Sequence, residues 1–253
     1  MRQLRPDIIV NASAYTAVDK AESEPQIAYL INAAIPSALA EEAVSIGALM
    51  VHYSTDYVFD GKQPGWYVED DVPNPQSVYG TSKLAGESGI AATGCRNLIF
   101  RTSWVFGAHG GNFAKTILRL AKERESLSVI ADQHGAPTSA HLIADVTAQV
   151  IVRYWKEVNR ESFPYGIYHL VAAGETTWYD YAKYVIDYAE KNGIALRLKS
   201  SAIEAIPSTD YPLPAPRPSN SKLDTGKLRN TFGLILPDWH QDMAHVLEKI
   251  ITV

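Results

Sequence analysis

The chain has 253 residues, 46% hydrophobic and 20% charged, so it can bury the core of one large or two modest globular domains. Its formal net charge of −5 and the lack of a Lys/Arg-rich run argue against a nucleic-acid partner. The single cysteine, Cys95, cannot form an internal disulfide and indicates a reducing cytoplasm. The apolar stretch Ile27 to Ala40 contains Asn32 and Pro36, which predicts a segment too short and too broken to span a membrane.

The first half of the chain alternates short apolar runs with longer helical patterns. Strands are predicted at Ile8–Val10, running into Asn11 and Ala12, then at Ala48–Tyr53 and Leu98–Thr102. Helices are predicted between them, at Glu22–Ile46 and Val78–Ala92. Strands and helices that alternate at this spacing favour a parallel sheet covered by helices.

The second half is less regular. Helices are predicted at Asn112–Glu125, with Asn112 as the N-cap, at Ala140–Trp155, and at Thr177–Lys191, where Asn192 and Gly193 end the last one. A returning strand is predicted at Tyr168–Val171, a proline-rich loop at Ile206–Pro218, and two short helical segments at Ser221–Leu228 and Asp238–Ile251.

The glycine-rich turn that normally opens a dinucleotide-binding fold is not found in the sequence. The cluster Gly107, Gly110 and Gly111 has a different spacing and follows a late strand. No acidic residue can be assigned to a cofactor ribose.

Tyr79 and Lys83 lie four residues apart on a predicted helix and therefore share one face. A neighbouring ammonium favours the phenolate, so we expect Lys83 to lower the pKa of Tyr79. Such a pair can pass a proton to a carbonyl oxygen as hydride reaches the carbon.

The spacing alone is weak support, because Tyr179 and Lys183 share it. Those residues belong to a tyrosine-rich helix that follows the last predicted strand, and we interpret them as structural. Tyr79, in contrast, follows the strand end Ser54–Phe59, and ligands bind at the carboxyl ends of parallel strands. Thr55 is our candidate for a hydroxyl that donates to the substrate carbonyl; a Ser/Thr turn that caps the strand is the alternative.

Six segments together resemble the dTDP-4-dehydrorhamnose reductase family, in its order and spacing and over nearly the whole chain. They are Asn11–Asp19, Ser54–Phe59, Tyr79–Glu87, Arg101–Gly107, Asp132–Thr138 and Arg217–Ser221. This family is part of the extended short-chain dehydrogenase/reductase superfamily. The resemblance implies an α/β fold with a doubly wound, Rossmann-like parallel sheet and a smaller α/β substrate domain. Residues 1–107 and about 140–172 would form an incomplete dinucleotide-binding domain, and about 108–139 and 173–253 the substrate domain.

The resemblance also implies a reaction and residue roles. NADPH or NADH would reduce the C4 ketone of a dTDP-4-dehydro-6-deoxy-L-hexose to dTDP-L-rhamnose, the last step of dTDP-rhamnose biosynthesis. Tyr79 would donate the proton, and Lys83 would bind the nicotinamide ribose. The sugar nucleotide would contact Thr55, Asp56, Trp104 and, through its diphosphate, Arg217. The cofactor would be lined by Ala12, Ser13 and Ala14.

Two departures from the family are visible. Its first strand, glycine turn and ribose acid are missing, so we expect an N-terminally truncated fold, with the strand at Ile8 left as an exposed edge. Some members bind Mg²⁺ with carboxylates at a dimer interface. Glu248 matches one of these, but His141 stands where another Glu is expected, which puts the metal in doubt. Whether the protein is a homodimer stays open.

Two other functions stay open. A sugar-nucleotide epimerase would keep the Tyr–Lys pair but hold NAD tightly and return the hydride. The regulatory subunit of methionine adenosyltransferase resembles these reductases and acts as a binding partner rather than as a biosynthetic enzyme. The match through the late loops favours the reductase.

Overall fold

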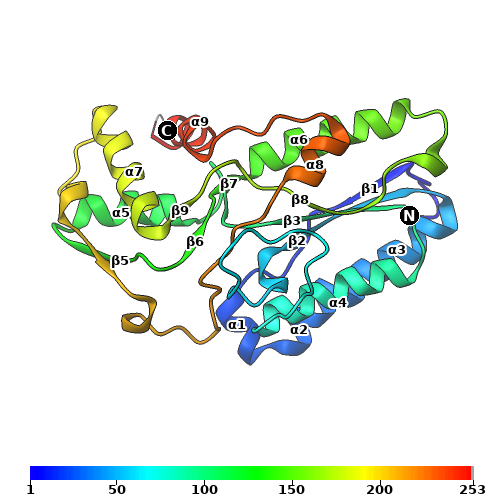
Figure 1. Cartoon of the computed structure of the whole chain (residues 1–253), viewed down its shortest axis with the longest axis horizontal. Helices are drawn as coiled ribbons and strands as arrows, with labels where there is room; N and C mark the ends of the chain where they lie inside the picture. The colour runs from blue at the N-terminus through cyan, green and yellow to red at the C-terminus, as the bar shows by residue number, and fades with distance from the viewer. Residues whose placement is uncertain (252–253) are drawn as a thin grey trace.

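A four-stranded parallel sheet forms the centre of the computed structural model, which describes residues 1–251 (Figure 1). Its strands lie in the order β1 (Ile8–Asn11), β2 (Leu49–Thr55), β3 (Asn97–Thr102) and β8 (Gly166–His169). All three pairings are parallel. The predicted α/β class with a parallel sheet is therefore confirmed.

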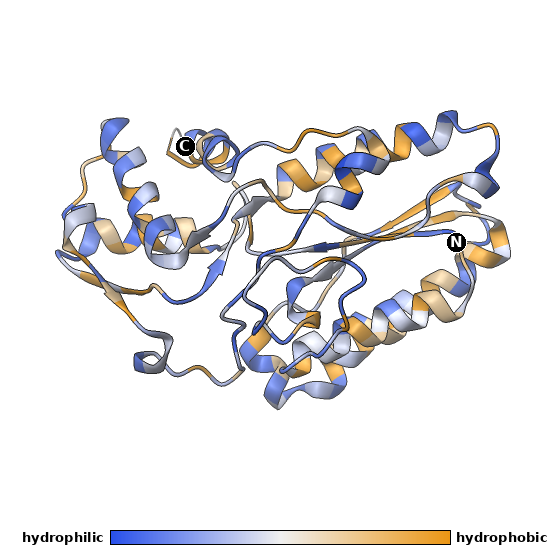
Figure 2. Cartoon of the chain, in the orientation of Figure 1, coloured by the Kyte–Doolittle hydropathy of each residue, from blue (hydrophilic) through white to orange (hydrophobic). Residues whose placement is uncertain are grey.

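Helices cover both faces of this sheet, because its side chains alternate between two apolar clusters. On β2, Leu49 and Val51 pack in the cluster that contains α6 (Ala140–Lys156), whereas Met50 packs in the cluster with α3 (Ile35–Ile46) and α4 (Val78–Ala92). Figure 2 shows the apolar residues along the central strands and on one side of these helices.

The α4 face is built from a nearly continuous helical segment. After α1 (Val18–Ser23), the chain forms α2 (Pro25–Tyr29), a π-helical turn η1 (Leu30–Ala34) and α3. Pro36 lies in the first turn of α3, where proline does not break a helix.

The helix Pro25–Ile46 has 22 residues and a mean hydropathy of 1.2, so it passes the length and composition test for a membrane span. The expectation of a segment too short and too broken was therefore wrong. The test is weak support for a membrane, because α3 packs on α4 and β2, as covering helices of α/β folds do.

The second half of the chain adds smaller elements around α5 (Phe113–Glu123), α7 (Trp178–Lys191) and α9 (Trp239–Ile251). Asn112 caps α5 as predicted, since its side chain accepts from the Lys115 N–H. Short strands form three pairs: β5 (Leu127–Ile130) with β10 (Ile203–Ile206), β4 (Val105–Phe106) with β7 (Thr138–Ser139), and β6 (His134–Gly135) with β9 (Thr176–Thr177). Short 3-10 turns lie at Asp56–Val58 (η2), Arg160–Ser162, Ser200–Ala202 and Ser208–Asp210.

Two predicted elements were misplaced. The strand expected at Tyr168–Val171 begins and ends two residues earlier, because Gly166 pairs with Leu98 at the start of the ladder. The helix expected at Ser221–Leu228 is α8, Gly226–Phe232. The first half of the expected segment is extended instead, since Leu223 forms a β-bridge with Tyr67.

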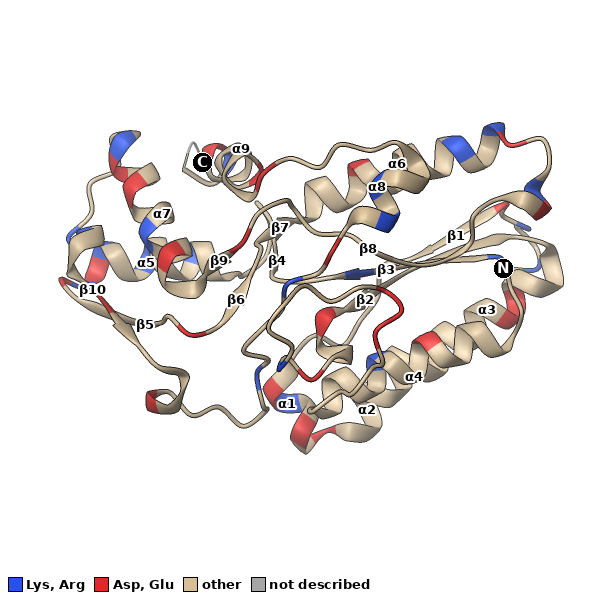
Figure 3. Ribbon diagram, in the orientation of Figure 1, with Lys and Arg blue, Asp and Glu red and all other residues tan. Residues whose placement is uncertain are grey.

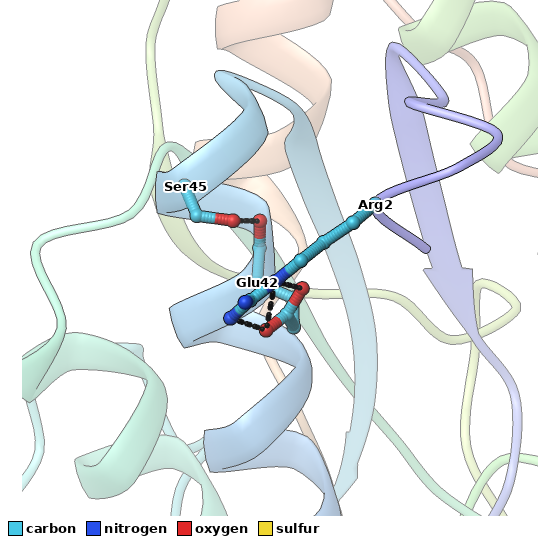
Figure 4. A network of polar contacts seen from close by, with 3 residues as sticks. All are labelled: Arg2, Glu42 and Ser45. Carbon is cyan, nitrogen blue, oxygen red and sulfur yellow. Dashed lines mark hydrogen bonds and ion pairs between the residues drawn. The ribbon is translucent and has the colours of Figure 1, made fainter.

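The N-terminal turn is attached to α3 by an ion pair. Figure 4 shows Arg2 against Glu42, with Nη2 2.6 Å from the carboxylate, and Ser45 donating to the Glu42 carbonyl. Arg2 is largely exposed and Glu42 is half-buried, so the contact fixes the turn and contributes little stability. Next to this turn β1 is the edge strand of the sheet, and Val10 is 46% exposed. Figure 3 shows Lys and Arg spread over both halves of the chain.

Candidate active site

The carboxyl ends of β1, β2 and β3 lie at the same edge of the sheet, because the three strands are parallel and in register. The segments that leave this edge are residues 12–17, the turn η2 and residues 103–104. They contain most of the predicted site residues. The structure thus brings together groups that are far apart in the sequence, at the place where open α/β sheets bind ligands.

Tyr79 lies in the first turn of α4, directly beside the end of β2. Ser77 caps the helix by accepting from the Gly80 N–H. Gly80 permits the close approach, since a Cβ at this position would collide with the Tyr57 carbonyl. The rings of Tyr57 and Tyr79 meet edge to face, with centroids 5.4 Å apart. Tyr79 therefore faces the turn that contains Thr55 and Asp56.

The pKa of Tyr79 is raised, contrary to our expectation. Burial is the main cause, hydrogen bonding with Thr55 opposes it, and the charge of Asp56 adds to it. Lys83 does not lower this pKa because its amine lies elsewhere: Nζ donates to the Tyr53 carbonyl at 2.6 Å. Tyr79 is thus a protonated phenol at neutral pH, which is the form that a proton donor requires.

Lys83 is almost fully enclosed, with 1% of its surface exposed, between α4 and β2. Besides the Tyr53 carbonyl, its Nζ contacts Nε2 of His52 at 3.2 Å. Burial lowers the pKa of Lys83 to about 8, although the nearby Glu87 carboxylate opposes the shift. A lysine with this pKa can gain or lose a proton near neutrality.

Buried hydroxyls without a partner lie around the strand ends. Within residues 1–251, the side-chain oxygens of Ser54, Thr102 and Ser103 are buried and have no hydrogen-bond partner. Thr55 next to them donates to Asp56 Oδ1 at 3.0 Å and accepts from the Tyr57 N–H. Unpaired buried polar atoms are costly, so their presence favours a ligand-binding role for this edge.

Asp56 is the acidic group of this cluster. Burial raises its pKa to about 6, and hydrogen bonds with Ser221 and Thr55 only partly offset that effect. It lies beside Thr55, Tyr57 and Tyr79, which makes it the second group here that changes charge near neutrality.

The loop after β1 carries Ala12, Ser13 and Ala14, all exposed. Asn32, a fully buried residue of η1, holds the following residue: its Oδ1 accepts from the Tyr15 N–H, and its Nδ2 donates to the Tyr15 carbonyl and to Ser82 on α4. The sequence analysis mentioned Asn32 only as a polar interruption. A polar residue within an apolar helical run was the signal that could have identified it, and π-turns are frequent at functional sites.

A buried ion pair attaches α4 to β3. Arg101 donates to both oxygens of Glu87, at 2.9 and 2.7 Å, and the two side chains are only 3% and 4% exposed. Glu87 lies on α4 after Tyr79 and Lys83 at helical spacing, so the pair fixes the helix that carries both. Both residues lie within segments that resemble the family, but their pairing was not predicted.

Trp104 lies at the end of β3 with a backbone φ of 47°, which is unusual for a residue with a side chain. Its ring stacks on Trp178 of α7, with centroids 3.8 Å apart, and lies against Gly135, where a Cβ would approach within 2.7 Å. Backbone strain of this kind is found at functional sites. One face of the indole is therefore already occupied by protein.

Arg217 lies in the proline-rich loop and reaches back to the site. Its Nη1 donates to the Tyr57 hydroxyl at 3.2 Å, and its Nη2 pairs with Asp19 of α1 at 2.6 Å. A cavity of about 210 Å³ opens beside it, lined in part by Tyr57, Ser77 and Ser219. A second cavity of about 270 Å³, lined in part by Trp66 and Leu236, contains none of the predicted site residues.

The second Tyr–Lys pair is placed differently. Lys183 lies over the ring of Tyr179, with Nζ 5.1 Å from its centroid, on α7 rather than on α4.

At the predicted metal position, His141 stacks on His245, with ring centroids 5.0 Å apart. In the described part of the chain, no group of three or more His, Cys, Asp or Glu side chains is placed to hold a metal ion.

The chain is similar in sequence and in fold to known proteins. Residues 1–252 match the family described as the RmlD substrate binding domain. The chain is 52% identical to a dTDP-4-dehydrorhamnose reductase of Escherichia coli (strain K12), over 100% of this chain and 82% of the relative. A crystal structure of a dTDP-4-dehydrorhamnose reductase from Clostridium acetobutylicum has a TM-score of 0.88 and 36% identity and covers 98% of this chain and 82% of its own.

A second solved structure is that of the Bacillus anthracis dTDP-4-dehydrorhamnose reductase in complex with NADP. It has a TM-score of 0.85 and 35% identity, and the match covers 98% of this chain and 82% of that one. Identity of this degree over nearly the whole chain shows common family membership, so the expected resemblance is confirmed. The chain belongs to the dTDP-4-dehydrorhamnose reductase family.

Proposed function

We propose that this chain is a dTDP-4-dehydrorhamnose reductase, which reduces the C4 ketone of dTDP-4-dehydro-6-deoxy-L-hexose to dTDP-L-rhamnose. The observation that carries the proposal is the position of Tyr79, a protonated phenol beside Thr55 and Asp56 at the carboxyl end of β2. Two relatives that are each 52% identical to this chain bear the name of that activity.

Each side chain has a part in the proposed reaction. Tyr79 donates its proton to the C4 oxygen as negative charge develops there. Thr55 donates a hydrogen bond to the same oxygen, releasing its present acceptor, Asp56. Asp56 then accepts from a sugar hydroxyl, and the part of Trp104 that protein leaves exposed contacts the sugar ring.

The nicotinamide cofactor, NADPH or NADH, supplies the hydride when bound. Ala12, Ser13 and Ala14 would line it: their small side chains leave the loop backbone exposed at the sheet edge. Lys83 would bind its ribose through an N–H that the bond to the Tyr53 carbonyl leaves free. Among residues 1–251, no glycine-rich turn has the spacing of a dinucleotide phosphate site.

Arg217 would bind the diphosphate of the sugar nucleotide. Guanidinium suits phosphate geometry, and the cavity beside Arg217 opens next to Tyr57 and Ser77. In the described structure the Asp19 carboxylate forms an ion pair with the Arg217 guanidinium. In our proposal the diphosphate takes the place of this carboxylate.

The domain division, with residues 1–107 and about 140–172 on the cofactor side, belongs to the same proposal, as do the cytoplasmic location and a dTDP-sugar as the binding partner. For Mg²⁺, the stacking of His141 on His245 does not provide the oxygen ligands that this ion prefers.

The proposal is tested by following NADPH oxidation with the 4-keto sugar nucleotide as substrate. The assay should use the chain as it stands, with the Escherichia coli relative as the positive control. We expect Tyr79→Phe to reduce the rate about 10²- to 10⁴-fold with unchanged folding, as for loss of a general acid. Tyr179→Phe is the matched control and should be nearly silent. Turnover by Tyr79→Phe within threefold of the parent would rule out the assigned role.

A further inference from the structure

His52 is a fully buried histidine that the proposed mechanism does not use. It lies on β2, opposite Asn11 of β1 in the sheet register, and is 0% exposed. Its Nδ1 lies 3.1 Å from Asn11 Nδ2, and its Nε2 lies 3.2 Å from Lys83 Nζ. Burial is the main cause that lowers the pKa of His52 to about 3, and the charge of Lys83 adds to it while the amine is protonated; the ring is therefore neutral at neutral pH. One ring nitrogen therefore carries a proton and the other accepts.

The orientation of Asn11 decides which nitrogen carries the proton. The backbone N–H of Ser13 is an obligatory donor, and it donates to Asn11 Oδ1 at 3.2 Å. The Ser13 hydroxyl donates to the same oxygen at 2.6 Å. Turning the amide around would place Nδ2 against the Ser13 N–H, donor against donor. Asn11 Oδ1 thus faces Ser13, and Nδ2 faces His52.

The same logic continues through the ring. Since Asn11 Nδ2 can only donate, Nδ1 of His52 must accept, and the ring proton lies on Nε2. This proton points at Lys83 Nζ. An ammonium has no lone pair to accept it, whereas a neutral amine can accept from Nε2–H and still donate to the Tyr53 carbonyl.

We infer that His52 is a positioning residue that sets the protonation state of Lys83. His52 presents an Nε2–H donor to the Lys83 amine. The bond between Ser13 and Asn11 fixes this donor, because it turns the Asn11 amide so that Nδ2 donates to His52 Nδ1. This inference rests on the proposed function only in the role it gives Lys83 and Ser13. It connects the loop that would line the cofactor to the charge of the lysine that would bind its ribose.

Other charged groups near Lys83 do not reproduce this effect. Glu87, one turn later on α4, favours the ammonium, and its own charge is engaged by Arg101 of β3. Tyr79, one turn earlier, is neutral, because its pKa is raised. Asn32, from η1, bonds to Tyr15 and Ser82. Apart from burial, His52 is the group whose hydrogen bond disfavours the ammonium.

The first measurement needs no substitution. Long-range ¹H–¹⁵N spectra of the ¹⁵N-labelled full chain, without cofactor or substrate, distinguish the protonated ring nitrogen of His52 from the bare one. We expect the proton on Nε2 at pH 9, above the Lys83 pKa of about 8, where the amine is neutral. A proton on Nδ1 would overturn the inference, because Nε2 would then accept from a Lys83 ammonium.

The second measurement follows the ε-carbon resonance of Lys83 against pH, identified by its loss in Lys83→Arg. In His52→Gln the amide oxygen can turn toward Nζ, so we expect the Lys83 midpoint to rise by about one pKa unit, a tenfold change in proton affinity. His169→Gln is the control, since His169 is also 0% exposed but bonds to the Asp224 carbonyl instead. An unchanged or lower midpoint in His52→Gln contradicts the inference. Neither measurement involves turnover, so both can be interpreted even if the reductase assay shows no activity. A negative result in either would contradict the inference about His52 but not the proposed reductase function.

Discussion

Glu87→Gln tests whether the buried ion pair stabilises the fold around α4. The substitution keeps the size of the side chain but leaves the Arg101 guanidinium, now 3% exposed, without a counter-charge. Breaking one partner of a buried pair costs about 3–5 kcal/mol in the free energy of unfolding, because the remaining charge stays desolvated. A chain of about 150–250 residues loses about 2–4 °C in Tm per kcal/mol, so a loss of about 3 kcal/mol predicts a fall of about 6–12 °C.

Urea unfolding followed by circular dichroism measures this change, with thermal melts as a second readout. The matched control is Glu123→Gln, which breaks the helix pair with Arg119, whose side chains are 61% and 54% exposed. An exposed pair of this kind contributes at most about 0.5 kcal/mol. The double variant Glu87→Leu with Arg101→Met should recover much of the loss, since apolar replacement of a whole buried pair is often neutral. If Glu87→Gln and Glu123→Gln lose the same small amount, our account of the α4 attachment is wrong.

Three further predictions concern the site. The folded-state pKa of Asp56, about 6, lies above its ordinary value of 3.8, so the stability it contributes at low pH is lost as pH rises through about 6. Urea titrations should show this decline in the parent and a flatter profile in Asp56→Asn; parallel profiles would contradict it. Asp19→Asn frees Arg217 and should tighten dTDP binding about two- to fivefold by calorimetry, whereas Glu190→Gln, which breaks a surface pair with Lys199, should not. Trp104→Ala should cost about 1 kcal/mol of substrate affinity, seen as a higher KM with unchanged cofactor binding; equal damage to both would point to a disturbed sheet edge.

The parts of the fold that follow from local patterns were predictable from the sequence. The apolar runs of the first three strands and the Asn112 cap lie within a few consecutive residues, and the structure has them where expected. The segment around Leu223 was not predictable in this way. Its helical pattern is overruled by a bridge to Tyr67, a residue far away in the sequence, and no local signal reports that pairing.

The candidate site shows the same limit at the level of single groups. Tyr79 and Lys83 share a face as helical spacing requires, but the spacing could not show that Nζ turns to the Tyr53 carbonyl. The pKa of Tyr79 was therefore expected to fall, and burial raises it. His52 occupies an ordinary strand position between apolar residues, and only the sheet register that places Asn11 beside it reveals its partner.

The contacts of α4 with η1 and with the sheet include a polar row where a helix of an α/β layer would normally bury apolar side chains. Successive contacts are Ser82 with Asn32, Lys83 with His52, and Glu87 with Arg101, and an apolar contact resumes at Ile90. Apolar residues of similar volume would stabilise this interface at least as well, because each polar pair is desolvated. Stability alone therefore does not explain the row. Directional bonds, however, fix the rotation and height of α4 against η1, β2 and β3, and Tyr79 lies in the first turn of the helix that these bonds hold.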